Sequence, residues 1–105
     1  MSESYDEIER RLRDAVTDAE LAWHTAITEA PLTDRAATSC RDLADALDAL
    51  LTFVRARVKV DEAVAIRKLE LQVGTTGTVL SHLQHEQDRL TAELDRLAAE
   101  VRDGA

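Results

Sequence analysis

Two histidines near the C-terminus have the spacing of metal ligands. His82 and His85 are three residues apart, and Glu86 follows directly. Residues three apart share one face of a helix, and imidazole nitrogens with carboxylate oxygens are common ligands of transition metals. His24 would add a third imidazole if an N-terminal helix packed on that face. One hypothesis is therefore a small helical-bundle metal-binding protein or enzyme that uses His82, His85 and Glu86.

The residues around these histidines weigh against such a site. No histidine has a glutamate three residues before it, as the Glu-x-x-His pairs of carboxylate-bridged centres require. The neighbouring leucines place His82 and His85 on an outer helix surface beside charged residues. No Ser/His/Asp or Cys/His combination suited to nucleophilic catalysis is evident. We therefore expect a protein that is not an enzyme and holds neither a metal nor a cofactor.

The clearest pattern in the chain is a seam of leucines. It has alternating spacings of three and four residues and includes one polar member, and we call it the C-terminal seam: Leu80, Leu83, Gln87, Leu90, Leu94, Leu97 and Val101. This spacing predicts a helix that lies along another helix, and a polar residue inside a seam can set its register. Trp23, at the edge of another apolar stripe, is a second candidate for contact with a partner.

Capping and breaking residues predict three helices, near residues 4–30, 33–73 and 78–103. Ser4 and Glu7 have capping-box spacing, Pro31 ends the first helix, and Thr33 starts the second. The first helix has an apolar stripe of Tyr5, Ile8, Leu12, Ala15, Ala19, Ala22 and Ala26, with Val16 and Trp23 beside it.

The middle helix has the broadest apolar surface. Its expected seam consists of Ala36, Cys40, Leu43, Leu47, Leu50 and Val54, with apolar flanks on both sides. This width indicates contact with two neighbours at once. Arg57 and Asp61 then occupy seam positions, which predicts a kink near residue 59. Cys40 is the only cysteine, and its place in the seam predicts a buried, reduced thiol and a cytoplasmic protein.

The segment between the second and third helices allows two interpretations. Residues 74–78, Gly-Thr-Thr-Gly-Thr, are poor helix formers whose summed cost against alanine is roughly 3–4 kcal/mol, which favours a turn at 74–77. However, heptads counted back from Val101 pass through Leu80, Thr76 and Val73 in phase. A continuous helix over 33–103 would be a rod of about 105 Å.

Composition predicts a single all-α domain, an antiparallel three-helix bundle or helical hairpin with coiled-coil character. The 105 residues are 45% apolar but only 3% aromatic, and their net charge is −8. An acidic chain disfavours nucleic acid as a partner, and no apolar run approaches the ~20 residues of a membrane span. Charge is uneven, because residues 55–68 carry five basic and two acidic groups. This basic band consists of Arg55, Arg57, Lys59, Arg67 and Lys68.

The unequal helix lengths suggest a function. The middle helix exceeds the other two by more than ten residues, which would leave apolar surface uncovered in a monomer. We therefore expect a non-catalytic protein–protein interaction or assembly protein, a structural subunit or adaptor that self-associates as a homo-oligomer or docks on another protein through its leucine and alanine seams. Besides the metal-binding hypothesis, an acidic regulator that mimics nucleic acid is a further alternative.

Overall fold

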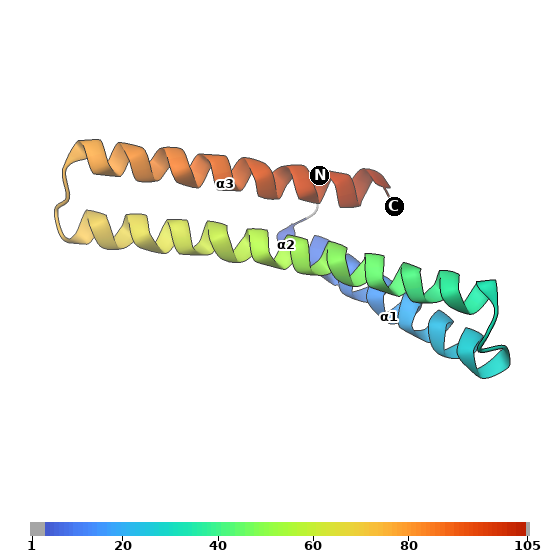
Figure 1. Cartoon of the computed structure of the whole chain (residues 1–105). Coiled ribbons are helices and arrows are strands. Elements are labelled where there is room, and N and C mark those ends of the chain that lie inside the picture. Colours follow the sequence, from blue (N-terminus) through green and yellow to red (C-terminus); the bar gives the residue numbers. More distant parts are fainter. Residues whose placement is uncertain (1–3, 105) are drawn as a thin grey trace. The chain divides into compact units, whose positions relative to one another are not determined.

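The computed structural model describes residues 4–104 and is all-α over that range. Helix α1 spans Tyr5–Glu29, α2 spans Asp34–Gln72 and α3 spans Gly77–Gly104 (Figure 1). Each of these bounds lies one residue from the expected one. Within residues 4–104 there is no strand, and no helix combines the length and apolar content that crossing a membrane requires.

The chain divides into two compact units. The first, Met1–Thr52, contains α1 and the first half of α2, and the second, Phe53–Ala105, contains the rest of α2 and α3. Each unit is an antiparallel pair of helical segments (Figure 1). Helix α2 is helical without interruption from Asp34 to Gln72. The kink near residue 59 and the single domain stay predictions.

Helix α1 begins at the expected cap. Ser4 has extended backbone angles, φ −69° and ψ 162°, and its hydroxyl oxygen accepts a hydrogen bond of 3.2 Å from the backbone N–H of Glu7. Asp6 and Glu7 in the first turn place negative charge at the positive end of the helix dipole. The capping interpretation of this segment is thus confirmed.

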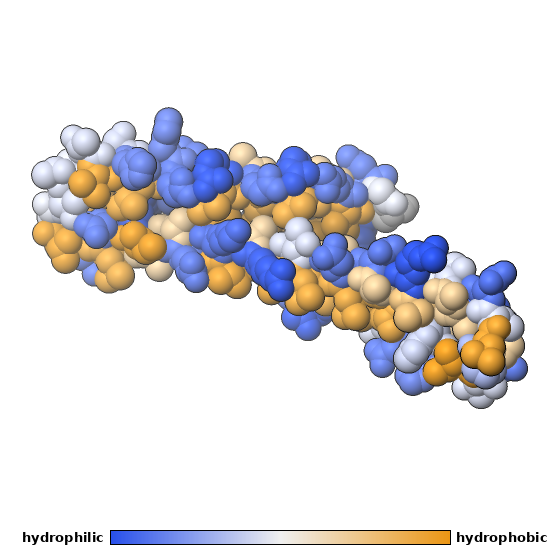
Figure 2. Space-filling model, viewed as in Figure 1, coloured by the Kyte–Doolittle hydropathy of each residue, from blue (hydrophilic) through white to orange (hydrophobic). Residues whose placement is uncertain are grey.

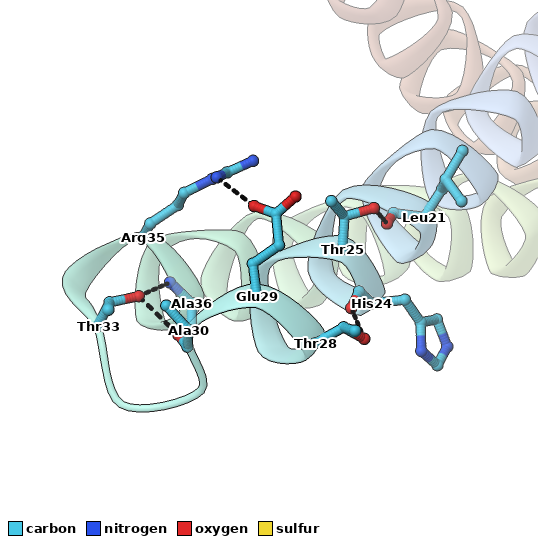
Figure 3. Close-up of polar contacts among 9 residues, drawn as sticks. All are labelled: Leu21, His24, Thr25, Thr28, Glu29, Ala30, Thr33, Arg35 and Ala36. Atoms are coloured by element: carbon cyan, nitrogen blue, oxygen red, sulfur yellow. Dashed lines mark hydrogen bonds and ion pairs between the residues drawn. The ribbon is translucent and has the colours of Figure 1, made fainter.

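The turn between α1 and α2 is held by one threonine and one ion pair (Figure 3). The Thr33 hydroxyl donates to the Ala30 carbonyl at 2.9 Å and accepts from the Ala36 N–H at 3.3 Å, so it caps α2 while closing the turn. Glu29 and Arg35 form a salt bridge of 2.9 Å across the turn. Both partners are more than half exposed, so this pair adds little stability.

The turn between α2 and α3 is a Schellman motif. Gly74 has φ +74°, its N–H donates to the Leu71 carbonyl at 3.3 Å, and the Thr75 N–H donates to the Glu70 carbonyl at 3.1 Å. The Thr75 hydroxyl also donates to the Glu70 carboxylate. The structure thus has a turn between residues 72 and 77, and the alternative of one continuous helix over 33–103 is wrong. A left-handed residue stops the helix, and glycine adopts that conformation without a steric penalty.

The packed face of α1 differs from the expected stripe. Ile8 and Ala26 are buried, as expected, but Ala15 and Ala22 are exposed. Val16 and Trp23, one residue further along, are partly buried in their place. Turning the helix toward these two larger side chains removes more apolar surface from water than burying two alanines would.

The first half of α2 is also turned relative to its expected seam. Ala36 is buried and Leu43 and Leu50 are partly buried, but Cys40 and Leu47 are exposed. Ser39 and Ala46 take their places on the covered side, again with spacings of three and four residues. The helix therefore packs through one flank of its broad apolar surface. The prediction of a buried Cys40 thiol is wrong, because the side that carries Cys40 faces solvent.

Candidate interaction surfaces

The C-terminal seam is covered by its own chain. Leu94 is 1% exposed, and the other six members are partly buried. Its spacing therefore marks the inner side of α3, as the coiled-coil pattern predicts. Because the chain itself supplies this cover, the apolar surface that is free for a partner lies elsewhere. The partner-binding role expected for these seven residues stays a prediction.

A polar layer interrupts the apolar contacts of the second unit. Gln87 is partly buried, and its Oε1 atom is buried without a hydrogen-bond donor among residues 4–104. Arg67 of α2 donates from Nη1 to Gln84 Oε1 of α3, and Gln84 Nε2 donates to Asp88 Oδ1 at 2.7 Å. Polar groups in such positions favour one alignment of two helices, because a shifted alignment would bury them among apolar side chains.

Trp23 is partly buried in the first unit. Its ring lies tilted against that of His24, with centroids 5.4 Å apart and an interplanar angle of 55°. His24 itself is exposed, with Nε2 4.0 Å from Glu20 Oε1, and its carbonyl accepts a hydrogen bond from the Thr28 hydroxyl (Figure 3). A partner-binding role for Trp23 stays a prediction.

The histidines of the metal-binding hypothesis do not converge with other ligands. His82 and His85 are exposed, and Glu86 accepts a hydrogen bond of 3.2 Å from Arg89 Nε. That hydrogen bond lowers the pKa of Glu86, with smaller contributions from the charges of Arg89 and His82. Over the described range, no group of three or more His, Cys, Asp or Glu side chains is arranged to hold a metal ion. The geometry of residues 4–104 thus provides no support for this hypothesis.

Exposed apolar residues gather on α2 in each unit. In the second unit they form a patch on the side of α2 away from α3, seen along the lower left edge in Figure 2, and we call it the second-unit patch: Val58, Ala65, Ile66, Leu69 and Val73. Leu69 and Val73 are 60% and 75% exposed. At 100° per residue these five positions lie within about 100° of the helix circumference. The apolar surface is continuous from Ala65 to Val73, and the exposed Glu62 separates it from Val58.

The first unit carries a smaller patch of the same kind. Its members are exposed and have spacings of four, three and four residues, and we call it the first-unit patch: Cys40, Ala44, Leu47 and Leu51. These positions lie within about 60° of the helix circumference. Leu47 and Leu51 are 41% and 47% exposed. Cys40 and Leu47, which the spacing predicts inside the seam, are thus members of an exposed surface.

Each patch has exposed charged residues of both signs nearby on α2. Arg41, Asp45 and Asp48 run beside the first-unit patch, and all three are exposed. Two heptads further along α2, the exposed Arg55, Lys59 and Glu62 have the same helical positions, but Arg55 and Glu62 lie within the arc of the second-unit patch. On α3, a hydrogen bond from Arg96 lowers the pKa of Glu93, and the charge of Lys59 adds a smaller contribution.

Comparison with known proteins provides no match from which a function could be inferred. No known family model matches the chain, no curated protein matches it, and no solved structure matches it. The class that the fold defines is a small all-α protein of helical hairpins. Any finer function has to be argued from the exposed surfaces of α2.

Proposed function

We propose that this chain is a non-catalytic interaction protein that binds another polypeptide through the exposed apolar surface of α2. The observation that carries the proposal is the second-unit patch, where Leu69, in the last turn of α2, and Val73, directly after the helix, are largely exposed. Exposing such side chains on a helix gains nothing for the isolated chain, whereas a second helix laid over them would remove their surface from water. Spacings that repeat along a helix suit a helical partner.

The acidic composition supports this role in one respect. A net charge of −8 keeps a protein with exposed apolar patches soluble at low concentration, because copies repel one another unless a specific surface brings them together. An assembly subunit or an adaptor has this combination of properties. Within the described residues, the exposed apolar patches are thus best explained as binding surfaces.

Site-specific photo-crosslinking in the cells that produce the protein tests the proposal. The photoreactive residue p-benzoylphenylalanine replaces Leu69 in one variant and Asp18, exposed on α1, in the matched control. We expect polypeptide adducts from position 69 in large excess over position 18. Equal adduct yields from the two positions would refute the proposal. The mass of the adduct identifies the partner as a second copy or as another protein.

A further inference from the structure

We infer that the turn end of the second unit docks end-on on the surface of an anionic phospholipid bilayer. We call this end the hairpin tip, and its exposed apolar members are Leu71, Val73 and Val79. The inference goes beyond the proposed function, because it names a second kind of partner and a surface that differs from the second-unit patch except at Val73. Association with a bilayer surface requires no helix that spans it.

The apolar inner side of α2 continues into the hairpin tip and loses its cover there. Leu71 follows Phe53 by 18 residues, which is about five helical turns, so the two side chains point in the same direction. Phe53 is 1% exposed, whereas Leu71 is 55% exposed because the hairpin ends beside it. Val73 and Val79, on either side of the turn, are 75% and 42% exposed. Apolar and pale residues gather at this end of the second unit in Figure 2.

A single partner helix does not fit this distribution. Leu71 lies about 160° around α2 from Leu69, so a helix laid along the second-unit patch leaves Leu71 in water. A bilayer that meets the hairpin end-on covers the tip from all sides at once. Three exposed apolar side chains at the end of a pair of helices, with no flat surface between them, thus suit a lipid interface better than a helical partner.

The charges at this end complement anionic headgroups. From residue 63 to residue 85 the only carboxylate is that of Glu70, which is partly buried and accepts a hydrogen bond from the Thr75 hydroxyl. The same stretch contains Arg67 and Lys68, so its net charge is +1 in a chain whose net charge is −8. The first turn of α3 contains no acidic residue, which leaves the positive end of its dipole uncompensated. An anionic surface therefore attracts the tip and repels the rest of the chain.

The position of Lys68 suits this orientation. Its side chain is exposed, and it precedes Leu71 by three residues, or about 4.5 Å along the helix axis. When Leu71 reaches the outer acyl layer, the long side chain of Lys68 can place its ammonium group among the headgroup phosphates.

The backbone of the turn is prepared for a less polar environment. The N–H groups of Val73, Gly74 and Thr75 donate to carbonyls of the last turn of α2 at 3.1–3.3 Å, and the Leu80 N–H donates to the Thr76 carbonyl at 3.1 Å. Backbone groups that already have partners lose little when water is removed from around them. The turn can therefore enter the interface without unfolding.

Co-sedimentation with lipid vesicles tests the inference. The unmodified chain should pellet with vesicles of equal parts phosphatidylglycerol and phosphatidylcholine and much less with phosphatidylcholine alone. Leu71→Ser with Val79→Ser should lower the partition coefficient about tenfold. Leu21→Ser with Leu32→Ser removes two exposed leucines from the first unit, 67% and 99% exposed, and is the matched control that should partition as the unmodified chain does.

A second variant tests the charge separately from the apolar contacts. Lys68→Gln should lower the partition coefficient on the anionic vesicles about fivefold and leave partitioning to phosphatidylcholine unchanged. Because Lys68 is exposed, this variant keeps the packing of the hairpin, which circular dichroism checks for all variants.

Several outcomes would overturn the inference. These are an unmodified chain that stays in solution with both kinds of vesicle, equal partitioning to both, or equal losses for the tip variant and its control. Polypeptide adducts from p-benzoylphenylalanine at position 71, in a chain that does not bind vesicles, would instead assign the tip to a protein partner. The crosslinks from position 69 test the proposed function independently, since that position lies on the other side of α2.

Discussion

The packing of the second unit predicts a large difference between two identical substitutions. Leu94 on α3 is 1% exposed, whereas Leu71 on α2 is 55% exposed. Leu94→Ala removes three buried carbon atoms and leaves a cavity, which costs about 3 kcal/mol of unfolding free energy. Leu71→Ala removes atoms that water already contacts, so we expect a loss below about 1 kcal/mol.

These free energies convert to melting temperatures. With about 2.1 cal/mol/K of unfolding entropy per residue, the 105 residues give about 220 cal/mol/K, so Leu94→Ala should lower Tm by about 14 °C. The loss for Leu71→Ala should stay below about 5 °C.

Circular dichroism during urea and thermal unfolding measures both variants. The protein concentration is low and the same for all samples, so that association does not contribute to stability. An unchanged denaturant m value shows that the variants unfold to a similar state. Equal losses for the two substitutions would refute the assignment of Leu94 to the inner side of the hairpin.

Three further outcomes follow from single positions. Gly74→Ala should lower stability by about 1 kcal/mol because φ +74° strains an alanine, whereas Gly77→Ala, in open space at the first residue of α3, should be neutral or stabilising in the same unfolding assay. Gln87→Leu should raise the free energy of unfolding by about 1 kcal/mol, because it removes a buried oxygen that lacks a donor among residues 4–104; a marked loss would contradict this. Arg89→Ala should raise the pKa of Glu86 in an NMR titration, since the hydrogen bond from Arg89 lowers it. Because the pKa of Glu86 is lower in the folded than in the unfolded chain, the stabilisation from this pair is present above the ordinary pKa of 4.5 and is lost as pH falls below it. If the variant and the unmodified chain still differed in stability at pH 2, the Arg89–Glu86 pair would not be the source of that difference.

The helices and their ends could be predicted from local chemistry. Ser4 and Thr33 cap helices through their side chains, and Gly74 ends a helix through its left-handed backbone conformation. These effects involve only residues a few positions away, so they can be predicted from the local sequence. The inner side of α3 could be predicted from the C-terminal seam in the same way, because α3 has one apolar side and polar residues elsewhere. Where a helix has a single apolar stripe, its inner side follows from the spacing.

The orientation of α1 and α2 could not be predicted in the same way. Beside each expected stripe runs a second apolar stripe at nearly the same spacing, so periodicity does not select between them. In α1 the larger Val16 and Trp23 are covered and Ala15 is not, and in α2 Ser39 is covered and Cys40 is not. The choice depends on the shape of the neighbouring helix, which a single helix's sequence does not contain.

The same ambiguity explains why periodicity alone does not identify the exposed surface of α2. Cys40 and Leu47 match a core pattern, although both are exposed. The signal that could have found the surface is the width of the apolar surface of α2, which exceeds what one neighbouring helix covers.

The native cysteine allows the most direct test of the account. Cys40 lies in the first-unit patch, and its thiol is exposed in the single chain. Its rate of reaction with a soluble disulfide reagent is measured on the purified chain at low concentration, and again with an excess of the partner that the crosslinks from position 69 identify. The account predicts a lower rate with the partner present, because the partner covers the exposed apolar surface of α2. A rate that the partner leaves unchanged would contradict it.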